Sequence, residues 1–201
     1  MDLAVIALTF GPIFLVELPD KTFVAALVLS TRYRPLPVWL GVGAAFAIQC
    51  LVAVTAGHFA TLLPDQVLHA ITALIFFAGA VLLVKTATGA AAEEKQQEEA
   101  YAKRSIGERS GWRAASASFL VVFAAEWGDL SQLLTIGLVA RYQDPVSVFV
   151  GSWGALLLVS GLAVLSGRLL LRHLRLSLLH YIAAAVCLGF AIFTAYEAIA
   201  A

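Results

Sequence analysis

Two short stretches of the chain place a glutamate and an aspartate three residues apart within strongly apolar sequence. They run from Glu17 to Thr22 (ELPDKT) and from Glu126 to Ser131 (EWGDLS), 109 residues apart. Each lies near the middle of a run long enough to cross a bilayer. A carboxylate at that depth costs about 2.5–3.5 kcal/mol on insertion scales, and such residues usually mark a functional site. The repeated pattern suggests one site built from two halves.

Helical geometry predicts how the acids of each stretch lie. Residues three apart in a helix share a face, so Glu17 and Asp20 should point the same way, as should Glu126 and Asp129. If the two helices face each other, four carboxylates converge, and they cannot all stay ionised in a low-dielectric interior. Protons or a cation must neutralise them. Competition between protons and a cation for the same oxygens is the minimal chemistry of an antiporter.

The available ligand atoms are oxygens, which suit Mg²⁺, Ca²⁺ and Mn²⁺, whereas thiolates and imidazoles suit zinc and copper. Neither stretch contains Cys or His, and Cys50 and Cys187 are interpreted as small buried side chains in apolar segments. No prosthetic group is expected. The predicted ligands of a hard divalent ion are the oxygen-bearing side chains of the two stretches and two intramembrane amides: Glu17, Asp20, Thr22, Glu126, Asp129, Ser131, Gln132 and Gln49.

The composition is that of an integral membrane protein. The 201 residues are 61% hydrophobic and 13% charged, against about 25% charged in soluble domains. A net charge of zero gives no support for a nucleic-acid partner. A spanning helix needs about 20 apolar residues. Six segments qualify, which predicts an all-α protein with transmembrane helices at approximately 3–31, 37–62, 66–86, 113–140, 146–171 and 178–200.

The first three segments and the last three repeat one another. Arg32 is followed by Tyr as is Arg141, at the offset of 109 that relates the acids, and Gly41 recurs as Gly151 at an offset of 110. Each half has an odd number of helices, so the halves must cross the membrane in opposite directions. Inverted repeats of this kind hold the substrate near the midplane of many secondary transporters. The predicted units are 1–86 and 113–201, joined by a charged linker at 87–112.

The distribution of basic residues predicts the orientation. Of the 13 Lys and Arg residues, Lys21 lies within a span, Arg141 lies alone on one side, and the remaining eleven lie on the side of the linker. Cytoplasmic loops carry the excess of Lys and Arg. We therefore expect a cytoplasmic linker and external termini, in the inner (cell) membrane. The linker is interpreted as solvated and partly helical, through pairs such as Glu99 and Lys103.

Both acidic stretches contain a residue that disfavours a regular helix. Pro19 lacks an N–H and clashes with the carbonyl one turn earlier, and Gly128, at the equivalent place, weakens the helix. A break there would free backbone carbonyls to bind a cation. A kink without any ligand role is the alternative.

Two copies of Glu-x-Gly-Asp-(Lys/Arg)-(Thr/Ser), each in the first helix of a three-helix half, resemble the Gdt family of cation transporters, and the resemblance covers the whole chain. It implies transport of Mn²⁺, and in some members Ca²⁺, against protons. It also implies that the motif residues form the site: Glu17, Asp20, Thr22, Glu126, Asp129 and Ser131. The chain departs from the pattern at Pro19, where the family has Gly, and at Leu130, where it has a basic residue.

The favoured interpretation is a secondary transporter, not an enzyme, that exports Mn²⁺ and also Ca²⁺ from the cytoplasm in exchange for protons. An exporter of Cd²⁺ or of a cationic amino acid, similar to the lysine exporters, is a second interpretation, although Lys21 is the only intramembrane base to recognise a substrate carboxylate. An intramembrane hydrolase with a carboxylate pair is the third. The zinc-protease motif His-Glu-x-x-His is absent from the sequence. The sequence leaves the oligomeric state open.

Overall fold

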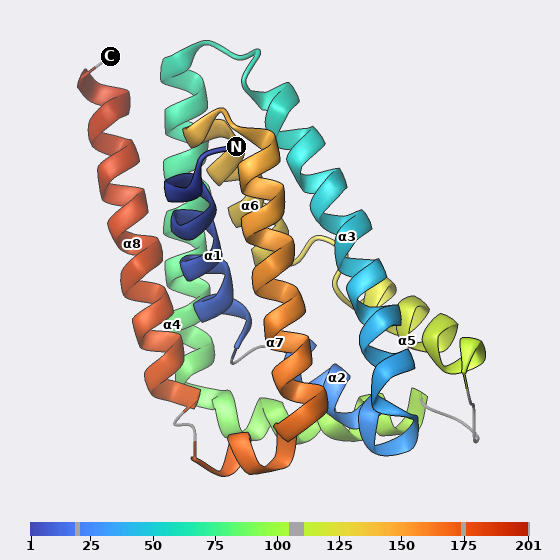
Figure 1. Cartoon of the computed structure of the whole chain (residues 1–201). Helices are drawn as coiled ribbons and strands as arrows, with labels where there is room; N and C mark the ends of the chain where they lie inside the picture. Colours follow the sequence, from blue (N-terminus) through green and yellow to red (C-terminus); the bar gives the residue numbers. More distant parts are fainter. Residues whose placement is uncertain (19–20, 105–110, 174–175, 201) are drawn as a thin grey trace.

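A computed structural model describes residues 1–18, 21–104, 111–173 and 176–200, and all regular secondary structure within these ranges is α-helical (Figure 1). The helices are α1 (Leu3–Glu17), α2 (Lys21–Arg32), α3 (Pro35–Ala60), α4 (Asp65–Arg104), α5 (Trp112–Ala125), α6 (Leu130–Tyr142), α7 (Pro145–His173) and α8 (Leu176–Ala200). Four of them are long and apolar enough to span a membrane, or five spans result if α5 and α6 count as one. The predicted all-helical membrane architecture is confirmed at this level.

Two of the predicted spans are each divided between two helices in the structure. The segment predicted at 3–31 contains α1, which ends at Glu17, and α2, which begins at Lys21. The segment predicted at 113–140 consists of α5 and α6, whose axes differ by 72°. Gly128 lies in this second break with a φ of +76°, a conformation that glycine adopts without steric cost. The break that Gly128 led us to consider is therefore present.

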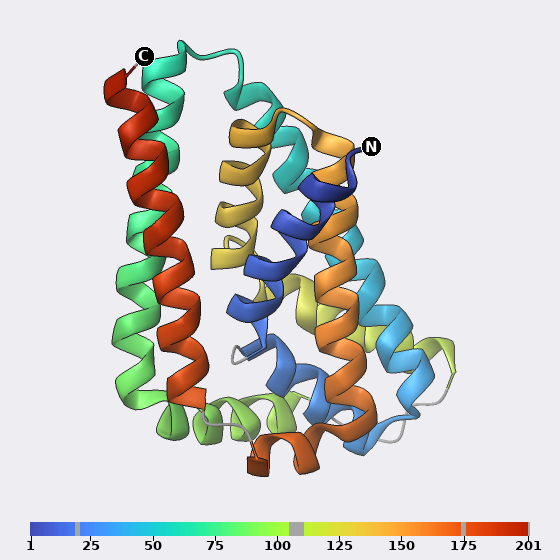
Figure 2. The same ribbon diagram turned by 60° about the vertical axis from the view of Figure 1, so that its left-hand side comes forward.

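The helix α3 packs against α5, α6 and α7. The helix α7 in turn packs against α1 and α2. A fully buried core connects these helices through residues such as Ile13, Val42, Leu138 and Val148. The helices α4 and α8 pack mainly against each other along one side of the bundle (Figures 1 and 2).

Glycines allow two helix pairs to approach closely. A Cβ on Gly41 would overlap the carbonyl oxygen of Ala115, so glycine lets α3 lie directly on α5. A Cβ on Gly151 would lie 2.7 Å from the carbonyl oxygen of Ile6, which gives the same kind of contact between α7 and α1. Small residues at helix crossings are the usual way in which membrane helices pack.

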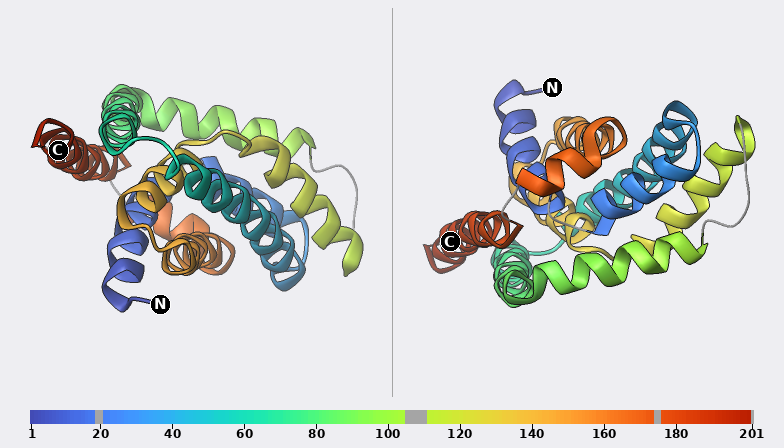
Figure 3. Two further views of the ribbon diagram at one scale, coloured as in Figure 1. Left: turned by 90° about the horizontal axis from the view of Figure 1, so that it is seen from above. Right: turned by 90° about the horizontal axis from the view of Figure 1, so that it is seen from below.

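The N-terminus and the end of α8 lie at the same end of the bundle, together with the α3–α4 and α6–α7 connections (Figure 1). At the opposite end α4 turns and continues across the bundle (Figures 1 and 3). The predicted linker is thus helical as far as Arg104. Helix α4 extends well beyond the predicted end of the third span at residue 86.

Candidate cation site

Two buried glutamates lie where a helix ends at a break. Glu17 is the last residue of α1 and is 1% exposed. Glu126 follows the last residue of α5 and is 3% exposed; its N–H donates to the carbonyl oxygen of Val122 at 2.9 Å. Both buried glutamates therefore lie at the end of a helix, and in the second half the chain turns away from the helix axis after the carboxylate.

The second break joins Glu126 to Asp129 through the backbone. The N–H of Asp129 donates to the carbonyl oxygen of Glu126 at 3.3 Å. The Asp129 carboxylate then caps α6, accepting from the N–H of Ser131 at 3.4 Å. The expectation that Glu126 and Asp129 share a helix face is wrong, because the helix stops between them. Asp129 is half-buried, and Ser131 is buried. Asp20 and the side chain of Thr22 lie outside the described residues.

The two predicted amide ligands hold the backbone of the second motif. The Gln132 Oε1 atom accepts from the N–H of Gly128 at 3.0 Å, which fixes the turn. The Gln49 Nε2 atom on α3 donates to the carbonyl oxygen of Phe123, one turn before Glu126, at 3.1 Å. An amide oxygen has two lone pairs, so these contacts leave both side chains with acceptor capacity for a cation.

One point on α3 lies near both halves of the predicted site. Gln49 is bonded to α5 just before the second break, while the thiol of Cys50, the next residue, lies within electrostatic range of the Glu17 carboxylate. Helix α3 therefore passes near both motifs. Cys50 and Cys187 are both buried and free, which confirms that they are not disulfide-bonded.

The predicted convergence of four carboxylates stays a prediction. Among the residues that the structure describes, no group of three or more Asp, Glu, His or Cys side chains is arranged to hold a metal ion. That search does not include Asp20, one of the four acids. What the described residues supply is two buried glutamates at helix breaks and one capping aspartate.

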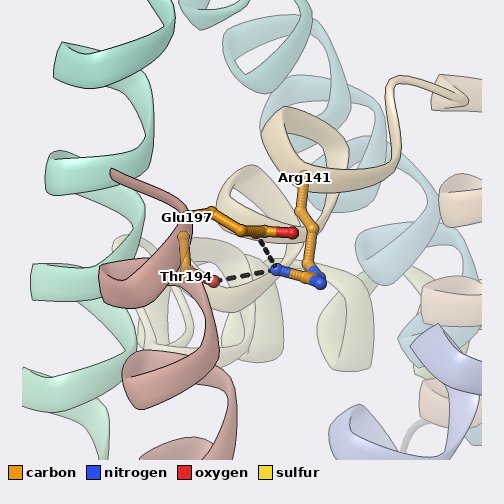
Figure 4. Close-up of polar contacts among 3 residues, drawn as sticks. All are labelled: Arg141, Thr194 and Glu197. Carbon is orange, nitrogen blue, oxygen red and sulfur yellow. Dashed lines mark hydrogen bonds and ion pairs between the residues drawn. The ribbon is translucent and has the colours of Figure 1, made fainter. Parts of the chain in front are cut away.

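A salt bridge anchors the far end of α6. The Arg141 Nη1 atom lies 2.8 Å from Glu197 Oε2 and 3.0 Å from Thr194 Oγ1, both on α8 (Figure 4). The guanidinium also lies over the ring of Phe193, 4.3 Å from its centroid. Helix α6, which Asp129 caps at its start, is thus held to α8 at its other end. Sequence analysis placed Arg141 alone on its side of the membrane and gave no indication of this partner.

Sequence analysis also missed a group of buried hydroxyls above Ser131. Thr135, one turn further along α6, donates to the carbonyl oxygen of Ser131 at 2.7 Å, and its Oγ1 atom lies 3.2 Å from Ser152 Oγ on α7. The i,i+4 spacing from Ser131 to Thr135 was the only signal in the sequence. Nothing in the sequence indicated Ser152.

An all-helical bundle with several apolar spans, interrupted at buried acids, defines a multi-pass membrane protein of the kind that transports ions. A family model described as "Divalent cation/proton antiporter GDT1" matches residues 5–91 and 114–201. The chain belongs to the GDT1 family. This is a family of transporters, not of enzymes.

Similar proteins occur in plants and bacteria. The chain is 32% identical to "Protein PAM71, chloroplastic" of Arabidopsis thaliana, over 95% of the chain and 56% of that protein. It is 34% identical to "GDT1-like protein 2, chloroplastic" of Oryza sativa subsp. japonica, over 92% and 59%. The chain thus spans little more than half of these plant relatives. It is 30% identical to "Putative manganese exporter" of Vibrio cholerae, over 96% of the chain and 92% of that protein. No solved structure matches the chain significantly.

Proposed function

We propose that this protein is a secondary transporter that exports Mn²⁺, and also Ca²⁺, from the cytoplasm in exchange for protons. The observation that carries the proposal is the burial of two glutamates, Glu17 and Glu126, each at the end of a helix that stops within an acidic stretch. The family description names divalent cations and protons. The printed name of the Vibrio cholerae relative supports manganese and the direction of export.

The proposed ligands are the residues predicted from the sequence. Glu17, Asp20, Glu126 and Asp129 supply carboxylates; Thr22, Ser131, Gln132 and Gln49 supply hydroxyl and amide oxygens. Broken helices also present backbone carbonyls, a common source of cation ligands in transporters. A buried carboxylate that is ionised and has no counter-charge is very costly. The site is therefore stable when it holds either a cation or protons, and this requirement couples the two fluxes.

We further propose six spans arranged as two inverted repeats, residues 1–86 and 113–201, with α1 and α2 forming the first broken span and α5 and α6 the fourth. The family model matches two stretches with nearly these bounds. The glycine contacts support the same relation: Gly151 lies 110 residues after Gly41, and their contacts Ala115 and Ile6 lie 109 residues apart. Each contact joins a residue of one half to a residue of the other.

The proposed orientation places the 87–112 linker in the cytoplasm and both termini outside, in the cell membrane. The excess of Lys and Arg on the linker side supports this orientation. In the proposed cycle, the carboxylates take up the cation from the cytoplasm, the two repeats rock about the site, and external protons displace the ion. The protonated, neutral site then returns.

Reconstitution into liposomes with simultaneous recording of Mn²⁺ and proton flux tests this function. Glu17→Gln and Glu126→Gln should each lower Mn²⁺ flux by at least about tenfold, because altering even the outer partners of a metal ligand costs about 10–100-fold. Glu99→Gln, at an exposed position of α4, is the matched control and should transport normally. Competition with Cd²⁺ and lysine separates the alternative substrates. Mn²⁺ flux that moves no protons, or that persists in both glutamine variants, would refute the proposal.

A further inference from the structure

Buried hydroxyls lie beyond the site on three of the helices that reach the end of the bundle carrying both termini. Thr9 on α1, Thr135 on α6, and Ser147 and Ser152 on α7 are each at most 2% exposed. Helix α1 packs against both α6 and α7. These side chains lie between the motif residue Ser131 and the rim of the bundle, in a region of the structure that is closed to solvent.

The first contacts are continuous with the motif. Asp129 caps the N–H of Ser131, whose carbonyl oxygen accepts from Thr135, and the hydroxyls of Thr135 and Ser152 lie 3.2 Å apart. Residues four apart in a helix are separated by about 6 Å along the axis. The series therefore leads away from the carboxylates, toward the end of α6.

Thr9 continues the series on α1. Its side chain lies against Gly151, the neighbour of Ser152, where the absence of a Cβ lets the two helices approach. Among the described residues, the fully buried Thr9 Oγ1 atom has no hydrogen-bond partner. A buried hydroxyl without a partner costs free energy, so its presence calls for an explanation.

The series ends at acids on the rim. The N–H of Asp2 and the carboxylate of Asp144 both bond to the Ser147 hydroxyl, joining the start of α1 to the start of α7. Hydrogen bonds from the Ser147 side chain and N–H lower the pKa of the half-buried Asp144 carboxyl, so this carboxylate stays charged. A negative charge at this position attracts a cation that leaves through the path beneath it.

The counterparts of these residues reproduce the series only in part. Thr9 corresponds to Ser118 on α5, whose buried hydroxyl likewise has no hydrogen-bond partner among the described residues. The offsets that relate the halves pair Thr135 with Ala26 and Ser152 with Val42, and both of these apolar side chains are fully buried. The contact between α6 and α7 is thus polar where the corresponding positions on α2 and α3 carry only methyl groups. A partly dehydrated hard cation needs successive oxygen ligands, and Thr135 and Ser152 offer neighbouring hydroxyls for that purpose.

We propose that Thr9, Thr135 and Ser152 line the path by which the cation leaves the carboxylate site for the side of the membrane that holds both termini. The path is closed in this structure and opens when α6 moves away from α7. This proposal rests on the transport function proposed above, and it adds residues outside the repeated motif.

The first test measures Mn²⁺ transport and equilibrium Mn²⁺ binding on the same variants. Thr135→Val and Ser152→Ala should each slow export about three- to tenfold, the range expected for one lost hydroxyl contact, and leave Mn²⁺ binding unchanged. The matched controls have hydroxyls bonded only within their own helix: Thr55→Val, whose hydroxyl donates to Leu51, and the buried Ser160→Ala. Both should transport normally. Parental rates in Thr135→Val and Ser152→Ala would overturn the path.

The second test uses the near-isosteric Ser152→Cys and decides the question even if Thr135→Val fails to fold. During transport, a membrane-impermeant thiol reagent added on the side of the termini should label Ser152→Cys at least about tenfold faster than Ser160→Cys and stop Mn²⁺ export. The parent chain, whose two cysteines are buried, is the background control. Absence of labelling in a protein that exports Mn²⁺ would refute the path alone. Absence of Mn²⁺ flux in the parent chain would refute the proposed function instead.

Discussion

The indole N–H of Trp153 on α7 donates to the carbonyl oxygen of Gly43 on α3 at 3.0 Å. These residues are 110 positions apart, the offset that relates Gly41 to Gly151. A residue can touch its own counterpart only beside the axis that relates two repeats. This contact supports a pseudo-two-fold axis between α3 and α7. We expect rocking of the two halves to pivot there.

The close approach at Gly41 predicts a large effect of a small substitution. In Gly41→Ala the added methyl group would overlap the Ala115 carbonyl oxygen, forcing α3 and α5 apart. We expect a loss of about 1–3 kcal/mol in the free energy of unfolding, as for other overpacked sites, measured by thermal unfolding in detergent. Gly11→Ala, also in a helix but with open space around it, is the control and should be neutral or stabilising. Equal stability of the two variants would contradict this packing.

The break between α5 and α6 depends on the backbone of Gly128. Gly128→Ala must hold a φ of +76° with a side chain, which costs about 1–2 kcal/mol. We expect lower thermal stability and slower Mn²⁺ flux. Gly128→Asn should recover part of the loss, because asparagine tolerates this region better than alanine. If alanine and asparagine behave alike, the effect does not arise from the backbone conformation.

The Arg141–Glu197 pair should stabilise the C-terminal end of α6. We expect the losses in unfolding free energy caused by Arg141→Met and Glu197→Gln to be less than additive in the double variant. The coupling energy should be about 1 kcal/mol and should fall as the salt concentration is raised. Arg141→Lys should recover only part of the stability, since lysine keeps the charge but loses the planar contact with Phe193. A double-mutant cycle on unfolding free energies measures this. Strict additivity would show that the two side chains act independently.

The parts of the molecule predictable from the sequence are those specified by local pattern. The length of the apolar runs predicts the helices, and Pro19 and Gly128 in the acidic stretches are the residues that pointed to a break. The argument from a shared helix face failed at Glu126 and Asp129 because it assumed a continuous helix, although Gly128 already indicated a break. Helix α4 extends beyond the predicted span of 66–86 because the charged sequence that follows also favours a helix.

Contacts between residues far apart in the chain could not be predicted from a single sequence. Nothing in the pattern paired Arg141 with Glu197, or Thr135 with Ser152, because these contacts depend on how α6 packs against α8 and α7. The bonds made by Gln49 and Gln132 were missed for the same reason. Residue type alone assigned them as ligands, while the structure also shows them holding the backbone around the second motif.

The central claim is that protons and a divalent cation compete for the same buried carboxylates. Its most direct test is the release of protons when Mn²⁺ is added to the purified protein in weak buffer, recorded with a pH indicator and compared with Mn²⁺ bound. We predict that binding releases protons, that affinity falls as pH is lowered, and that the double variant Glu17→Gln/Glu126→Gln loses both binding and release. Tight Mn²⁺ binding that releases no protons, with an affinity that is the same at about pH 6 and about pH 8, would contradict the account.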